Sequence, residues 1–170
     1  MRSVVIRLQK SALIYDIDNC SYVEGDIMEP SNENAKVQTF DIAQKGNIDR
    51  VTRMLNLAYS ECVEMLYPYA KETIEGGGYP IIASPLGISC PPEEYYINLS
   101  LPKNFSATTI KLLTNLIHEY LVCRVLSDWM SIVNPGSKAN WEDKANKIKA
   151  KISASLVSRT GALRRKSNPF

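Results

Sequence analysis

The longest periodic pattern in the chain is SATTIKLLTNLIHEYLVCRVLSDWMSIVNPGSKANWEDKANKIKAKISASLVSRTG, residues 106–161. Its first part repeats apolar residues at helical spacing: Ile110, Leu113, Ile117, Leu121, Val125, Trp129 and Val133. Ser106 is suited to cap this helix, and a tight turn over residues 134–137 is expected to end it. The second part repeats Trp141, Ala145, Ile148, Ile152 and Leu156, and Gly161 stands where a helix commonly stops. Two long amphipathic helices with a short connection pack antiparallel, so the sequence predicts a long helical hairpin.

Two short segments alternate apolar and polar residues, as half-buried strands do. Residues 3–8 place Val4, Ile6 and Leu8 on one face. Residues 95–101 do the same with Tyr95, Ile97, Leu99 and Leu101, and Pro102 ends the run. The two predicted strands are candidates to pair with each other.

The remaining segments predict two further helices and two loops. Helical spacing from about Lys10 to Glu24 predicts a short helix that carries Leu13, Ile17, Cys20 and Val23 and is closed by Gly25 and Pro30. The polar residues 29–36 predict an exposed loop. A 3.6-residue period from Ile48 to Leu66 predicts an amphipathic helix with Asn47 as its N-cap. Glycines and prolines concentrate over residues 75–92 and predict a long irregular loop.

Together these elements predict a mainly α protein. Its fold is a helical bundle with a long antiparallel helical hairpin, plus a small β element and an extended C-terminal tail. Residues 1–161 form one helical domain, because 170 residues of which 45% are hydrophobic can bury a single core. Residues 162–170 keep no helical period and carry three basic side chains, so they are interpreted as a basic, extended tail.

Composition favours a protein that stays in the cytosol of the cell that makes it. The apolar runs are far shorter than the roughly 20 residues that a transmembrane helix needs. The N-terminal residues interleave Arg2 and Arg7 with valine and isoleucine, which is unlike a signal peptide. Four cysteines, at positions 20, 62, 90 and 123, are too far apart for a zinc or redox motif, so reduced and mostly buried thiols are expected.

Charge is divided unevenly along the chain. Residues 137–170 hold nine basic and two acidic side chains, a net charge of +7. The preceding 136 residues hold 11 basic and 16 acidic side chains, a net charge of −5. Such asymmetry indicates an electrostatic partner, which is a nucleic acid, a membrane surface or the acidic half of a neighbouring copy.

Side chains that could carry catalysis or hold a metal do not converge in the sequence. His118-Glu119 opens like a helical zinc-protease motif, but Val122 stands where the motif needs its second histidine. His118 and Cys123 lie about 140° apart around a helix, so a hydrogen-bonded structural histidine and an inert buried thiol are preferred. The acidic residues Asp16, Asp18, Glu24 and Asp26 are interpreted as a solvated face. The sequence predicts no enzyme, no cofactor and no metal site.

Two tryptophans and a run of lysines mark the hairpin. Trp129 and Trp141 flank the turn and are expected in the core there, with an exposed binding anchor as the alternative. The second helix carries Lys144, Lys147, Lys149 and Lys151, a run that is usually only a solvated face. Its continuation into the basic tail favours an acidic partner. Without an aromatic stacking pattern, any contact with nucleic acid would be to phosphates.

Several short motifs in the second half of the chain resemble proteins of tailed bacteriophages. They are Asn104-Phe105-Ser106, Ile117 to Val122, Asp128-Trp129, Asn134-Pro135, Trp141 and Arg164 to Phe170. Over residues 95–170 the chain looks like the head–tail adaptor proteins, also called connector or head completion proteins, of crAss-like phages that infect Bacteroides-type bacteria.

The resemblance implies a structural virion protein at the head–tail junction, made in the cytoplasm of the host bacterium. Its copies would form a homo-oligomeric ring, twelve-fold in such proteins, between the portal protein and downstream tail or connector proteins. The C-terminal segment would dock into a groove on the portal or on a neighbouring subunit.

The same resemblance implies which residues form interfaces. In the tail they are Arg164, Arg165, Lys166, Pro169 and Phe170. On the basic helix they are Lys144, Lys147 and Lys151, which would face packaged DNA non-specifically or an acidic subunit surface.

Two other functions remain open on the sequence alone. A tail-completion or other phage virion protein would use the same features with a different neighbour. A nucleic-acid-binding accessory protein would use the +7 segment directly on phosphates. An enzyme is the least favoured class, since its groups would have to converge from distant segments.

Overall fold

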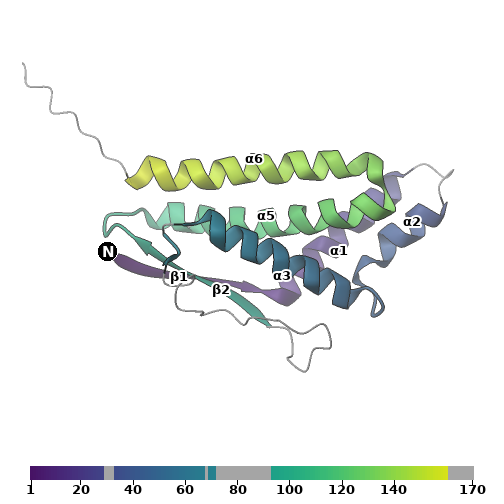
Figure 1. Cartoon of the computed structure of the whole chain (residues 1–170), viewed down its shortest axis with the longest axis horizontal. Coiled ribbons are helices and arrows are strands. Elements are labelled where there is room, and N and C mark those ends of the chain that lie inside the picture. The colour runs from purple at the N-terminus through teal and green to yellow at the C-terminus, as the bar shows by residue number, and fades with distance from the viewer. Residues whose placement is uncertain (29–32, 68, 72–92, 161–170) are drawn as a thin grey trace, which may run out of the picture.

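The computed structural model describes residues 1–28, 33–67, 69–71 and 93–160. Of these, residues 158–160 are described in their backbone only. The described chain is mainly α-helical with one small sheet, in the order β1, α1, α2, η2, α3, β2, α5, α6 (Figure 1). This confirms the predicted fold class. The predicted irregular loop at 75–92 and the predicted tail at 162–170 lie outside the described residues.

The predicted helical hairpin is present and forms the long axis of the molecule. Helix α5 (Ala107–Val133) and helix α6 (Pro135–Thr160) pack against each other along their length (Figure 1). The predicted face of α6 is buried at Ala145, Ile148, Ile152 and Leu156. The expected four-residue turn is wrong, because Asn134 alone separates the helices. Proline is well suited to the first helical position, where its missing N–H has no helical partner in any case.

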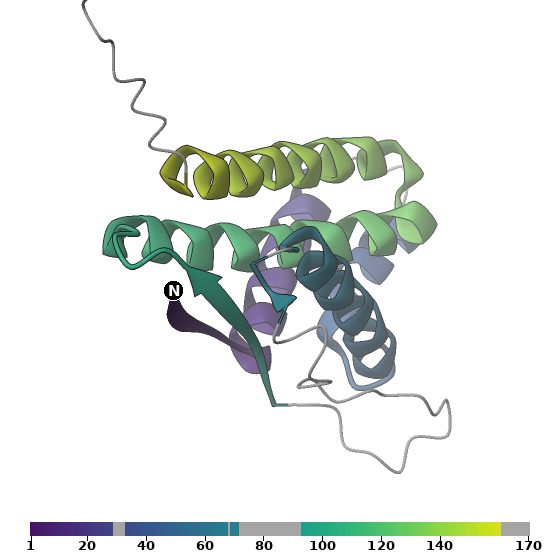
Figure 2. The ribbon, with the colours of Figure 1, turned by 60° about the vertical axis from the view of Figure 1, so that its left-hand side comes forward.

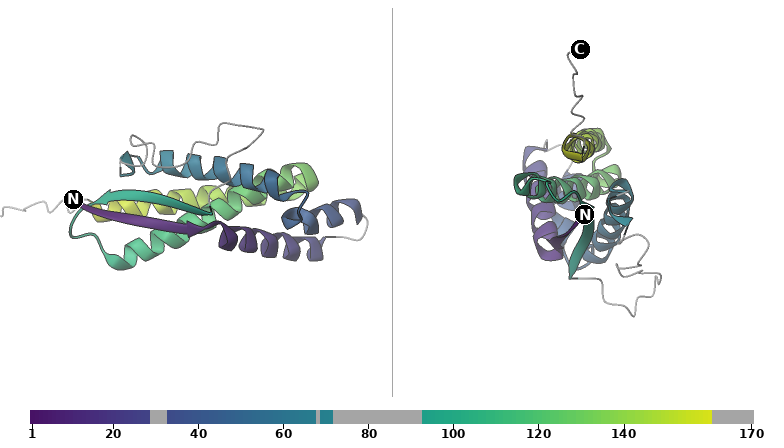
Figure 3. Two further views of the ribbon diagram at one scale, coloured as in Figure 1. Left: turned by 90° about the horizontal axis from the view of Figure 1, so that it is seen from below. Right: turned by 90° about the vertical axis from the view of Figure 1, so that its left-hand side faces the viewer.

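Helix α5 lies at the centre of the fold. Seen end-on, it has α6 on one side and α1, α3 and the sheet around its other sides (Figure 3). The sequence predicted a single apolar face, but the structure also buries Tyr120, Val122, Cys123, Leu126 and Met130. A helix that is covered on several sides is apolar nearly all round.

The two predicted strands form one antiparallel pair. Strand β1 (Arg2–Gln9) and strand β2 (Glu94–Leu101) pair with Ile6 opposite Ile97. The predicted inward residues of β2 are all buried, and in β1 Ile6 and Leu8 are buried while Val4 is half-buried. The sheet therefore closes the core on the side away from α6, as Figure 2 shows.

The N-terminal helices differ most from expectation. Helix α1 (Lys10–Ile27) continues through Gly25, and residues 33–36, predicted as loop, begin helix α2 (Glu33–Phe40). The one-turn 3₁₀ helix η2 (Asp41–Ala43) then leads to α3 (Ile48–Met65), which confirms the predicted amphipathic helix. Val23, predicted to be buried, is exposed, whereas Ser21 and Gly25 face the core instead.

The N-cap residues of α3 and α5 are the predicted ones, but they do not make the predicted capping hydrogen bonds. Asn47 and Ser106 precede the two helices, yet neither side chain makes a capping hydrogen bond. Asn47 instead donates its Nδ2 to the backbone carbonyl of Asp41 at 2.8 Å. The side chain thus fastens the η2 segment to the start of α3.

Gly25 allows α1 and α2 to approach closely. A Cβ at this position would lie 2.9 Å from the Phe40 ring. We therefore expect Gly25→Leu to lower the free energy of unfolding by about 1–3 kcal/mol, the usual cost of overpacking. The matched control is Gly46→Leu, because a Cβ at Gly46 meets nothing within 4 Å. Urea unfolding checks this, and equal effects of the two substitutions would contradict the close approach.

Candidate functional site

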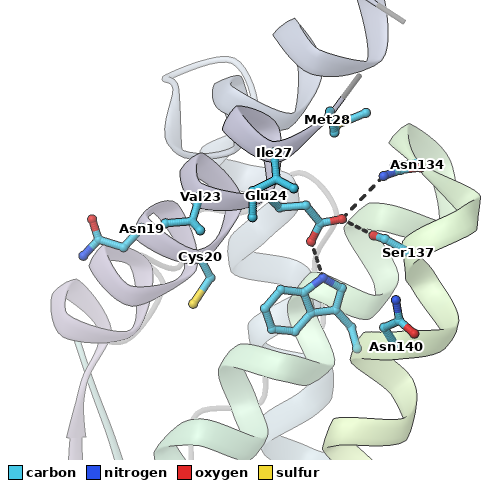
Figure 4. Close-up of a pocket in the computed structure, with 10 residues that line it drawn as sticks. Asn19, Cys20, Val23, Glu24, Ile27, Met28, Asn134, Ser137 and Asn140 are labelled. Carbon is cyan, nitrogen blue, oxygen red and sulfur yellow. Dashed lines mark hydrogen bonds between the residues drawn. The ribbon is translucent and has the colours of Figure 1, made fainter. Parts of the chain in front are cut away.

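An open groove lies where α1 passes the turn of the hairpin (Figure 4). We call it the turn-end groove. It has a volume of about 620 Å³ and mostly apolar walls. Its lining residues are Asn19, Cys20, Val23, Glu24, Ile27 and Met28 beside Asn134, Ser137, Asn140 and Trp141. Val23 and Ile27 are 57% and 78% exposed, so α1 presents two apolar side chains to solvent here.

Glu24 holds the two sides of the groove together. Its carboxylate accepts hydrogen bonds from the Trp141 indole N–H and the Ser137 hydroxyl, and a longer one from Asn134 Nδ2 at 3.5 Å (Figure 4). Ser137 lies in the first turn of α6, where the helix dipole favours a negative charge. Glu24 therefore ties α1 to the start of α6 and fixes the orientation of the Trp141 ring.

Replacing this carboxylate is expected to loosen the junction. Glu24→Gln removes the charge and leaves one amide oxygen for the three donors, so we expect a loss of about 1–3 kcal/mol in the free energy of unfolding. Urea unfolding monitored by tryptophan fluorescence measures it. Asp26→Asn, an exposed carboxylate two residues further along α1, is the control and is expected to change stability by less than about 0.5 kcal/mol. Equal losses in both variants would disprove the role of Glu24.

The predicted basic face of α6 is partly neutralised within the molecule. Lys144 lies 2.6 Å from a Glu119 carboxylate oxygen and 5.2 Å from the centroid of the Trp141 ring. Lys147 pairs with Asp143, also at 2.6 Å, one turn earlier on the same helix. Lys151 is exposed. Lys144 thus belongs to the junction of α5, α6 and the groove, while Lys147 and Lys151 face solvent.

The predicted tail interface lies outside the described residues. This concerns Arg164, Arg165, Lys166, Pro169 and Phe170. The assignment of these tail residues to an interface therefore stays a prediction, whereas the positions of the α6 lysines are described above.

His118 has a structural partner, as the sequence predicts. Its Nε2 lies 2.6 Å from Asp16 Oδ2, which joins α5 to α1. The predicted solvated acidic face of α1 is therefore wrong for Asp16 and Glu24, because both carboxylates bind side chains of other helices. Each of these contacts crosses more than 100 residues of sequence.

The three cysteines in the described chain are free thiols, and two of the three are buried. This agrees with the prediction of reduced and mostly buried thiols. Cys62 and Cys123 are buried, and Cys20 is half-buried beside the groove. Burial raises the pKa of Cys62 to about 12 and that of Cys123 to about 11. A thiol with a raised pKa is a poor nucleophile at neutral pH.

The raised thiol pKa makes stability depend on alkaline pH. The unfolded thiol ionises near pH 9, whereas burial holds the proton of Cys62 to about pH 12. The contribution of the protonated Cys62 thiol to the free energy of unfolding is fully present below pH 9. It is lost as the pH rises towards 12, by about 1.4 kcal/mol per pH unit. Urea unfolding at several pH values should give a shallower decline for Cys62→Ala than for the unmodified chain. Parallel declines would contradict this assignment.

A second, polar groove lies between α3, α5 and α6, with a volume of about 890 Å³. Arg124 sits in its wall and donates to both oxygens of Glu61, at 2.9 and 3.2 Å, and to Asp128 at 2.7 Å. These hydrogen bonds, led by the one to Glu61, raise the pKa of Arg124 further above its ordinary value. Leu57 is an exposed apolar residue in the same wall.

Neither groove holds a recognisable metal-binding set. Within residues 1–28, 33–67, 69–71 and 93–160, no three His, Cys, Asp or Glu side chains are grouped as metal ligands would be. None of the helices described combines the length and apolar character that a bilayer span requires.

The turn-end groove could not be located from the sequence. Glu24 and Trp141 are 117 residues apart, and a glutamate among other acidic residues is ordinarily exposed. The available clue was Trp141, since an indole N–H near a core needs an acceptor. Comparisons with protein-family models, curated proteins and solved structures find no match to this chain.

Proposed function

We propose that this chain is a non-enzymatic structural subunit of a tailed-phage virion, a head–tail adaptor whose copies form a ring between the portal and the tail. The observation that carries the proposal is the turn-end groove. The fold closes its own core around α5, yet it leaves Val23 and Ile27 exposed beside a partly buried tryptophan. A concave apolar surface beside a core that the described elements already form is typical of an interface.

The hairpin suits such a role mechanically. Helices α5 and α6 run side by side over 27 and 26 residues, or about 40 Å. The turn end carries the groove, and Thr160, from which the basic segment continues, lies at the opposite end of α6 (Figure 1). In a ring, one end of each subunit would face one neighbour and the other end would face another.

Localisation in purified virions tests this function. Immunogold labelling against the chain is expected to mark the junction of head and tail at one site per particle. Label at the distal tail would indicate the tail-completion alternative. Absence of the chain from purified particles would overturn the virion role.

A second candidate function is non-specific binding of nucleic acid through α6. It is favoured by the exposed side chains of Lys138, Lys147, Lys149 and Lys151 on one helix. Against it, Lys147 already pairs with Asp143, and Glu142 is exposed on the same helix. Affinity for duplex DNA that falls steeply with salt, together with an absence from virions, would favour this function over the adaptor.

A further inference from the structure

The turn-end groove is suited to an apolar side chain that arrives from outside. Val23, Ile27, Met28 and the Trp141 ring form its apolar part. Glu24, the one charged residue in its lining, already accepts hydrogen bonds from α6. An aromatic or aliphatic anchor would therefore be bound there by burial of apolar area.

The α1 side of the groove favours a basic partner, while on the α6 side Lys144, near the Trp141 ring, is already paired with Glu119. Helix α1 carries four carboxylates, against Lys10 as its single basic residue; they are Asp16, Asp18, Glu24 and Asp26. Asp16 and Glu24 are used within the fold, whereas Asp26 is exposed next to the lining residue Ile27. A segment that combines basic residues with an apolar anchor would match both the charge and the apolar wall.

This chain contains such a segment. Residues 162–170 read ALRRKSNPF, with three basic side chains, no acidic one, and Phe170 four residues after Lys166. Phenylalanine buries a large area while only two side-chain torsions are fixed, so it is an effective anchor. Three basic residues ahead of the anchor would speed its encounter with the acidic helix.

Chain length argues against binding within one copy. Trp141 and Thr160 are 19 residues apart on α6, which is about 29 Å. The ten residues from Thr160 to Phe170 span at most about 33–36 Å when fully extended. Phe170 would reach its own groove only if the segment ran straight back along α6 in a nearly fully extended form. A second copy does not impose this constraint.

We propose that the turn-end groove of one copy binds residues 162–170 of a second copy, with Phe170 against Val23, Ile27 and Trp141. The contact joins two different surfaces, so repeated copies form a ring when the rotation closes. This inference rests on the proposed function in that the ring brings copies together. It goes beyond that function by naming the turn-end groove as the surface that binds residues 162–170, and a second copy as the molecule that supplies them.

Photo-crosslinking between full-length copies tests the contact directly. One copy carries p-benzoylphenylalanine in place of Phe170, and the other is unsubstituted and isotope-labelled throughout. After irradiation, mass spectrometry is expected to find cross-links from the light copy to residues 19–28 or 134–141 of the heavy copy. Cross-links only within the light copy, only at other surfaces, or none at the highest soluble concentration would each overturn the proposal.

Matched substitutions identify the groove. Val23→Asp and Ile27→Asp place a charge in the apolar wall at exposed positions, so the fold tolerates them and the cross-link yield is expected to fall about tenfold or more. Leu57→Asp is the control, because Leu57 is 54% exposed and lies in the other groove. Circular dichroism verifies that all three variants are folded. Loss of the cross-link in Leu57→Asp, with retention in Val23→Asp, would overturn the assignment.

The outcome separates this inference from the proposed function. Cross-linking uses the purified chain without a portal, so copies of a protein that never enters a virion would still give the groove cross-link. Conversely, a virion protein whose segment docks on the portal would label the head–tail junction without giving that cross-link.

Discussion

Leu121→Ala is expected to lower the free energy of unfolding by about 2–5 kcal/mol, a large share of the total stability of a domain of this size. Leu121 is fully buried near the middle of α5, the helix that contacts α1, α3 and α6. Removing its side chain loses burial energy and leaves a cavity among elements that cannot all collapse inward. Alanine is a better helix former than leucine, so helix propensity does not account for any loss.

Urea denaturation followed by circular dichroism measures this effect. Leu112→Ala on the same helix is the matched control, because Leu112 is half exposed and the deletion is chemically identical. We expect it to cost less than about 1 kcal/mol. Similar losses for the two variants would contradict the central position of α5.

Removing residues 162–170 is expected to impair assembly while leaving the fold intact. The buried cluster consists of residues between Ile6 and Leu156, and α6 ends at Thr160, so the described core loses no member. The truncated chain should therefore unfold within about 0.5 kcal/mol of the full chain. Its association should weaken by tenfold or more, because the basic residues and the phenylalanine are both lost.

Mass photometry across a dilution series reads the assembly, and urea unfolding reads the fold. Two substituted chains separate the contributions. Replacing Arg164, Arg165 and Lys166 by glutamine should mainly slow association and reduce its salt dependence. Phe170→Ala should mainly speed dissociation. Unchanged assembly of the truncated chain would remove the tail from the mechanism.

The hairpin, the strand pair and α3 could be predicted because each rests on local periodicity. In α6 the residues Ala145, Ile148, Ile152 and Leu156 repeat at helical spacing and are buried as that spacing requires. Alternation also excludes a register shift of one residue, which would expose Ile97 and Leu99, but it does not choose between registers two residues apart. The dense apolar run over 120–126 was a usable sign that α5 is covered on more than one side.

The N-terminal helices could not be predicted in the same way. Helix α2 is short, with Thr39 as its one buried residue, so its sequence resembles a loop. Gly25 looks like a helix stop, but here its missing side chain makes room for the Phe40 ring. That reason exists only once α1 and α2 are packed together.

The candidate site depends still more on tertiary contacts. Lys144 was assigned to a basic surface from its neighbours in sequence, whereas its partners Glu119 and Trp141 lie on the helix opposite and one turn away. The pairing of Glu24 with Trp141 likewise follows from the antiparallel return of α6. Periodicity predicts which side of a helix is buried, and it carries no information about which polar groups meet across helices.

The most direct test of the central claim is electron microscopy of the tagged full-length chain, recovered from its native source with its partners attached. The adaptor account predicts a closed ring of copies seated on a portal-like assembly, with the turn-end groove of each subunit occupied by the C-terminal segment of its neighbour. Isolated monomers, or copies held only to DNA, would contradict the account and move the basic face of α6 to the centre of a nucleic-acid function.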